Sequence, residues 1–143
     1  MEHFCTLDDK GRISVPARIR SSMKENKLVL TKGDAKGLWL FFPEEWERFS
    51  ETLMSIPVSL KKSQAIRYRF IVPKVDVEID KAGRIAVPQS LREFAGLTRD
   101  CKILEAHKHL ELWDSDRYDA FLSESEENLQ EVLEEMGPTT LFV

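Results

Sequence analysis

The hydrophobic and polar positions of this chain follow two periods, one typical of strands and one typical of helices. Residues 75–79 alternate apolar and polar side chains, which predicts a half-buried strand. Trp46, Phe49 and Leu53 recur at the spacing of one helical face, shortly after Pro43, which suits the start of a helix. The same reasoning predicts an α+β protein. Its other strands are expected over residues 3–8, 13–15, 27–31, 38–42, 84–87, 101–106 and 110–113, and its other helices over 16–23, 60–70, 88–95 and a last helix capped by Ser115 or Asp116.

A duplication organises these elements. The segment Asp8–Arg20 recurs as Asp80–Arg92, at a constant offset of 72 residues. Each half, at roughly 70 residues, would be marginally stable alone, so the repeats are predicted to form one fused pair of half-domains. The same register continues downstream, because Leu38, Leu40, Phe41, Trp46 and Phe49 fall on Leu110, Leu112, Trp113, Tyr118 and Phe121.

The repeated motif predicts a tight turn between two strands. Gly11 and Gly83 can adopt a positive φ without a steric penalty. Asp8 and Asp80, each three residues before the glycine, can accept hydrogen bonds from the turn amides. These four residues are therefore predicted to be structural residues of the two turns.

Charge is distributed unevenly along the chain. The net charge is −4, but residues 114–136 carry nine acids and one base, so residues 1–113 have a net charge of +4. A basic body with an acidic tail indicates binding of a polyanion on one face. A second interpretation is that the tail is simply a solvated helix. Residues 60–70 carry Lys61, Lys62, Arg67 and Arg69 without an acid, which favours either a solvated face or one that contacts phosphates or a subunit.

No pattern for catalysis or for a bound metal is found in the sequence. His3, His107 and His109 do not have the spacing of metal ligands with either cysteine, and no P-loop, nucleophile elbow or dinucleotide fingerprint is present. We expect no enzyme activity, cofactor or small-molecule substrate. Cys5 and Cys101 are expected to be reduced thiols. No apolar run approaches the length of a membrane span. The N-terminus has no basic region followed by an apolar core, so we expect no signal peptide and a cytoplasmic protein.

Arg12 and Arg84 are the strongest candidates for binding. Each follows a turn glycine, so its side chain has room to project, and arginine makes bidentate contacts with guanine edges or phosphates. The alternative is that each arginine pairs with Asp8 or Asp80, or with a carboxylate of another subunit, and locks the turn. An oligomer would present several such arginines to a repeated DNA site.

Together these motifs resemble the MraZ family of bacterial transcriptional regulators, whose fold is related to the AbrB and SpoVT DNA-binding domains. The resemblance implies a duplicated swapped-hairpin β-barrel, an intrachain pseudo-dimer with peripheral helices and a long acidic C-terminal helix. Its parts would be residues 1–57, a basic helical linker over 58–73, and residues 74–143. The resemblance rests on paired Asp-x-x-Gly-Arg motifs, each followed by Ile-x-Val-Pro, on residues 43–46 and 88–97, and on the acidic last helix.

The resemblance also implies a function. Ring-shaped homo-oligomers would bind short G-rich direct repeats in double-stranded DNA, upstream of the division and cell-wall gene cluster, and usually repress it, in association with the nucleoid. The arginine of the family motif contacts DNA, which carries over to Arg12 and, less directly, to Arg84. Lys10, Arg18 and Arg20 are further candidates, and Lys10 is matched by an alanine in the second repeat. The alternatives are a protein-interaction scaffold or an antitoxin-like subunit.

Overall fold

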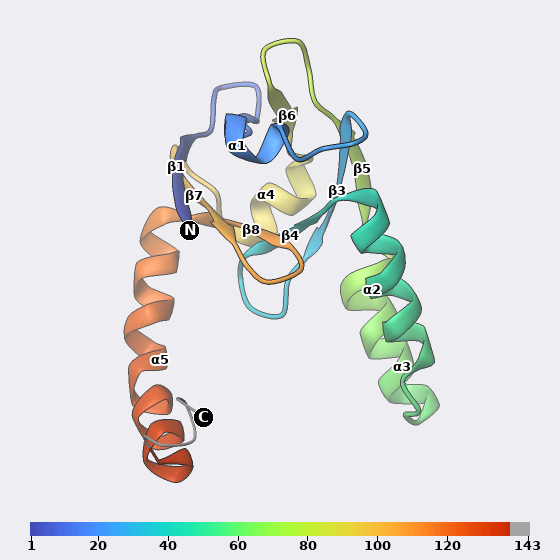
Figure 1. Cartoon of the computed structure of the whole chain (residues 1–143), viewed down its shortest axis with the longest axis vertical. Helices are drawn as coiled ribbons and strands as arrows, with labels where there is room; N and C mark the ends of the chain where they lie inside the picture. The colour runs from blue at the N-terminus through green and yellow to red at the C-terminus, as the bar shows by residue number, and fades with distance from the viewer. Residues whose placement is uncertain (138–143) are drawn as a thin grey trace.

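The computed structural model describes residues 1–137 of the 143-residue chain, and the apolar segment at residues 139–143 lies outside this range. Within residues 1–137, eight strands are interspersed with helices in two similar series, which Figure 1 shows. In chain order the elements are β1 (Glu2–Thr6), β2 (Arg12–Ser14), α1 (Ala17–Arg20), β3 (Lys27–Lys32), β4 (Leu38–Phe41), α2 (Pro43–Ser55), α3 (Leu60–Ile66), the π-helical segment η1 (Arg67–Ile71), β5 (Val75–Glu78), β6 (Arg84–Ala86), α4 (Gln89–Ala95), β7 (Asp100–Glu105), β8 (Leu110–Asp114) and α5 (Ser115–Met136).

The two repeats exchange strands. A six-stranded antiparallel sheet has the order β1-β7-β8-β4-β3-β5, so the first strand of each repeat pairs with a strand of the other repeat. A separate two-stranded sheet joins β2 to β6, with Ile13 opposite Ile85. The predicted α+β class with a mostly antiparallel sheet is confirmed. The closed barrel is not confirmed, because the sheet runs from β1 to β5 and no pairing among residues 1–137 joins these two edges.

In the described part of the chain, a hydrophobic core lies between the sheet and the short helices and draws on both repeats. Ile13 and Ile85 are fully buried at its centre, and Ile19 of α1 and Leu91 of α4 occupy matching positions in it. A smaller cluster of Val29, Phe41 and Trp46 forms where α2 packs on the first repeat. The duplicated apolar pattern therefore builds a shared core rather than two separate ones.

Two helical arms extend from the body of the protein. α2 and α3 form one arm and α5 forms the other, on opposite sides of the sheet (Figure 1). The first arm is anchored through the linker, because the Thr31 hydroxyl donates to the Phe70 carbonyl at 2.6 Å and the Phe70 ring stacks on Trp39 at 5.3 Å. The apolar side of α5 remains exposed in the single chain: Phe121, Leu122, Leu129, Val132, Leu133 and Met136.

Several predicted boundaries differ from the structure. α1 has four residues rather than the eight predicted over 16–23, because the Ser22 and Met23 amides donate to carbonyls three residues back and the chain continues as turns. The predicted cap of the last helix was wrong: the N-cap is Asp114, whose carboxylate accepts from the Arg117 amide at 3.3 Å. Across residues 1–137, every helix is too short or too polar to cross a membrane.

The two cysteines are free thiols that lie opposite each other on paired strands. Cys5 of β1 is the register partner of Cys101 of β7, so the pair spans the two repeats. Hydrogen bonding with the Cys101 thiol, together with burial, raises the pKa of Cys5 above its usual range. Cys5 is therefore protonated at neutral pH.

Candidate functional site

The first Asp-x-x-Gly-Arg turn is closed by the side chain of its aspartate. Asp8 Oδ1 accepts the backbone amides of Lys10 at 2.9 Å and Arg12 at 2.8 Å, and Asp8 Oδ2 accepts Arg12 Nε at 2.8 Å. Gly11 has a φ of 75°, which only glycine adopts readily. The turn therefore fixes the start of the Arg12 side chain through a backbone and a side-chain bond to one carboxylate.

The second turn has the same geometry 72 residues later. Asp80 Oδ1 accepts the amides of Ala82 and Arg84, each at 2.9 Å, and Asp80 Oδ2 accepts Arg84 Nε at 3.2 Å. Gly83 has a φ of 78°. Because the sequences that form the turns are nearly the same, the same local hydrogen bonds close both of them.

Both turn carboxylates are stabilised in the ionised form. The backbone hydrogen bond from Arg12 is the main cause that lowers the pKa of Asp8, and that from Arg84 does the same for the pKa of Asp80. Each aspartate is consequently a charged acceptor at neutral pH. The adjacent guanidinium is thereby oriented by a charge-assisted hydrogen bond.

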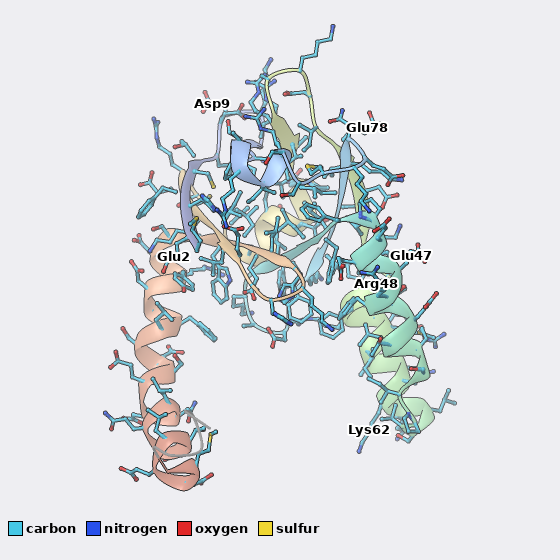
Figure 2. The ribbon with its side chains drawn as sticks, in the orientation of Figure 1. Glu2, Asp9, Glu47, Arg48, Lys62 and Glu78 are labelled. Atoms are coloured by element: carbon cyan, nitrogen blue, oxygen red, sulfur yellow. The ribbon has the colours of Figure 1, made fainter. Side chains whose placement is uncertain are left out.

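The two turns lie side by side at one end of the protein. The Val15 amide donates to the Gly83 carbonyl at 2.8 Å, and the Val87 amide donates to the Gly11 carbonyl at 2.9 Å. Arg84 Nη1 is 3.9 Å from Asp8 Oδ2, so the turns also meet through their charged side chains. Figure 2 shows Asp9 of the first turn at the end of the molecule opposite the tips of the helical arms.

The predicted arginines have different surroundings. The side chains of Arg12 and Arg84 keep 28% and 34% of their surface exposed while paired with their own aspartates, so pairing and partial exposure occur together. Lys10 is exposed on the first turn. Arg18 extends away from the turn toward Glu105, with its Nε 3.4 Å from the carboxylate.

Arg20 makes a contact between the repeats that the sequence did not predict. It lies against Gly83 in the turn of the other repeat, and its counterpart Arg92 lies against Gly11. Arg92 was not among the predicted residues, although the offset of 72 residues from Arg20 was sufficient to find it. The exposed Lys81 in the second turn was missed as well, and it occupies the position of Asp9.

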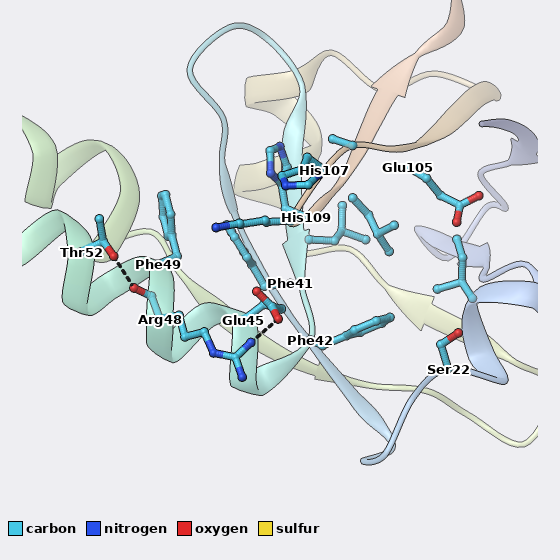
Figure 3. A pocket seen from close by; sticks show the side chains of 15 residues that line it. Ser22, Phe41, Phe42, Glu45, Arg48, Phe49, Thr52, Glu105, His107 and His109 are labelled. Atoms are coloured by element: carbon cyan, nitrogen blue, oxygen red, sulfur yellow. Dashed lines mark hydrogen bonds and ion pairs between the residues drawn. The ribbon is translucent and has the colours of Figure 1, made fainter.

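A groove of about 640 Å³ is a second concave feature, between α2 and the β7–β8 hairpin (Figure 3). Phe41, Phe42 and Phe49 supply apolar lining, and the Arg48 side chain is paired with Glu45. One of its two histidines, His109, packs at a tilt against Trp39, with ring centroids 4.5 Å apart, and so belongs to the aromatic packing. The groove is lined mainly by groups that already have partners in the fold.

Comparison with known proteins identifies similar sequences over nearly the whole chain. Residues 1–68 and 70–137 each match the model of a family described as "MraZ protein, putative antitoxin-like". The chain is 45% identical to the transcriptional regulator MraZ of Treponema denticola over 138 residues, which cover 95% of each protein. It is 40% identical to the transcriptional regulator MraZ of Frankia alni over 136 residues, covering 95% of this chain and 94% of that protein. The two matched ranges correspond to the two repeats.

Proposed function

Because the chain belongs to the MraZ family, we propose that it is a sequence-specific DNA-binding transcriptional regulator and not an enzyme. It would repress the division and cell-wall gene cluster by binding G-rich direct repeats in double-stranded DNA upstream of it. The observation that carries this proposal is the adjacent placement of two Asp-x-x-Gly-Arg turns, each presenting a partly exposed arginine. A cytoplasmic, nucleoid-associated location follows from this role.

Arg12 is the proposed reader of guanine. Its Nε is held by Asp8, and the two terminal nitrogens of its guanidinium would supply the donors for the O6 and N7 acceptors of guanine. Arg84 is held in the same way by Asp80 and is the second candidate reader. Each turn also offers one exposed lysine beside its arginine: Lys10 in the first turn, and Lys81, at the position of Asp9, in the second.

Contacts with phosphates would set the position of the protein on DNA. Residues 1–113 have a net charge of +4, and the side chain of Arg18 on α1 is 65% exposed. Arg20, placed near the second turn, belongs to the same proposed set of residues. Neutralised phosphates release counterions, so affinity should fall steeply as the salt concentration rises.

We also propose that the chain assembles as a ring-shaped homo-oligomer of intrachain pseudo-dimers with the swapped-hairpin barrel of the family. Its parts would be residues 1–57 and 74–143 with a basic linker over 58–73. The surface of α5 supports assembly, because it combines exposed apolar side chains with an excess of acids. The surface of α3 and η1 combines exposed apolar side chains with basic ones, so it is complementary in charge to α5 of another copy. A heterologous contact of this kind closes into a ring when its rotation permits.

Binding to two duplexes tests the proposed function. One duplex carries several G-rich direct repeats and the other a scrambled sequence, and each is titrated across a salt series. Arg12→Ala should weaken binding to the repeats by roughly 1–3 kcal/mol and reduce the preference for them. Lys108→Ala is the matched control: it also removes one positive charge, but it lies on the β7–β8 hairpin at the end of the sheet remote from the turns. Equal, weak binding to both duplexes would reject the proposal.

The second candidate function is a protein-interaction scaffold or antitoxin-like subunit. The exposed apolar side chains of α5 favour it, since such a face is typical of protein contacts. In that case the arginines would only lock the turns, and Arg12→Ala would leave DNA binding unchanged while loss of the apolar side of α5 would abolish partner binding.

A further inference from the structure

Each turn glycine is covered by an arginine from the other repeat. A Cβ built on Gly11 would lie 2.8 Å from Arg92 Cζ, and a Cβ built on Gly83 would lie 2.8 Å from Arg20 Cζ. Both glycines are buried, although the residues on their N-terminal side are exposed. Each guanidinium group therefore packs against the turn backbone just before a strand begins. Arg92 lies at the start of β2, which begins with Arg12, and Arg20 lies at the start of β6, which begins with Arg84.

Backbone hydrogen bonds reinforce this crosswise contact. The Val15 amide donates to the Gly83 carbonyl, and Arg20 Nε donates to the Val15 carbonyl at 2.9 Å, so Arg20, Val15 and Gly83 form one continuous link between the repeats. In the other half the Val87 amide donates to the Gly11 carbonyl. Arg92 Nε is buried there without a hydrogen-bond partner among the described residues, so packing is what places this nitrogen against the turn.

We infer that Arg20 and Arg92 are positioning residues for DNA recognition, each acting on the turn of the opposite repeat. Arg92 would hold the turn that presents Arg12, and Arg20 would hold the turn that presents Arg84. This inference rests on the proposed function of the turns, and it gives Arg20 a supporting role in place of a direct contact. A binding group must be held within about 0.5 Å of its productive position, which explains why the turn needs support from outside its own repeat.

The planar shape of the guanidinium is essential to this role. Lysine carries the same charge but has a compact ammonium that cannot lie flat on a peptide. A direct phosphate contact, in contrast, would tolerate lysine. Arg92→Lys and Arg20→Lys therefore separate positioning from simple charge without changing the net charge of the protein.

The DNA experiment combines these variants with Arg12→Ala on the G-rich repeat duplex. Arg92→Lys should weaken binding about tenfold in the otherwise unchanged protein and have little further effect when Arg12 is already alanine, because the two residues act through the same turn. Arg20→Lys is the matched control. It should change affinity by the same factor in the original protein and in Arg12→Ala, because Arg20 supports the other turn. The inference is overturned if Arg92→Lys leaves affinity unchanged, or if its effect is the same in both backgrounds.

Amide NMR spectra of the free protein test the geometry without DNA. Arg92→Lys should shift the Gly11 resonance and spare that of Gly83, whereas Arg20→Lys should shift Gly83 and spare Gly11. Shifts confined to the variant's own repeat would overturn the crosswise arrangement. If the unaltered protein does not distinguish the two duplexes, the proposed function fails, and these spectra still decide whether each arginine supports the opposite turn.

Discussion

The glycine at the centre of each turn offers the sharpest test of the site. Gly11→Ala introduces a side chain at a φ of 75°, and its Cβ would meet the Arg92 guanidinium at 2.8 Å. An L-residue in the left-handed region costs about 1–2 kcal/mol. Alanine also reduces the conformational freedom of the unfolded chain, which offsets about 0.4–1 kcal/mol of this cost. Displacement of the Arg92 side chain adds to the cost. We therefore expect a net loss of about 1–2 kcal/mol in the free energy of unfolding.

Urea denaturation measures this loss, which corresponds to a decrease of about 3–6 °C in Tm for a chain of this size. Gly83→Ala is the internal replicate, because its φ of 78° and its contact with Arg20 are nearly the same. Gly137→Ala is the control: its φ is 74°, but a Cβ there would have nothing within 4 Å, and it follows the end of α5. A Gly11→Ala protein as stable as the original, or a Gly137→Ala protein equally destabilised, would refute the reasoning.

Three further predictions concern the core, the turn carboxylates and the thiols. Ile13→Ala, at a fully buried position, should lower the free energy of unfolding by about 2–5 kcal/mol in urea denaturation. Asp8 and Asp80 have lowered pKa values, so their contribution to stability is present above the unfolded pKa of about 3.9 and is lost as pH falls through the folded values. The urea midpoint should thus fall less steeply below about pH 4 when both are asparagine. A mild thiol oxidant should join Cys5 to Cys101 within one chain, because directly opposed residues of antiparallel strands are within disulfide range, and a non-reducing gel detects the compact product.

Each of these predictions has a result that contradicts it. If Ile13→Ala lowers the free energy of unfolding by less than about 0.5 kcal/mol, the position behaves like a surface site, which contradicts its place in the core. Parallel pH profiles for the original protein and the double asparagine variant would remove the turn carboxylates as a source of acid sensitivity. An oxidised product that links two chains, or one that persists in Cys5→Ser, would show that the opposed thiols are not the reactive pair.

Local patterns were sufficient for the order of the strands and helices and for the geometry of the two turns. The spacing of Asp8, Gly11 and Arg12 contains the whole turn, because each bond that closes it joins residues no more than four positions apart. The duplication, the α+β class and the MraZ family are recognisable for the same reason. The cap of α5 was not predictable in this way, because three adjacent polar residues are equally suitable. Asp114 is selected because Thr98 donates to the same carboxylate, at 2.7 Å from its hydroxyl.

The pairing of the repeats was decided only by the tertiary structure. The two halves carry nearly the same local signals, so nothing in the sequence near Arg20 or Arg92 specifies which turn glycine each side chain will cover. The same holds for β1, whose alternating pattern suits a neighbour from either repeat. Burial of one shared core, with Ile13 opposite Ile85, brings the halves together and places each arginine on the opposite turn. The sequence thus determined the parts of the site by short-range interactions, while long-range packing determined how those parts support one another.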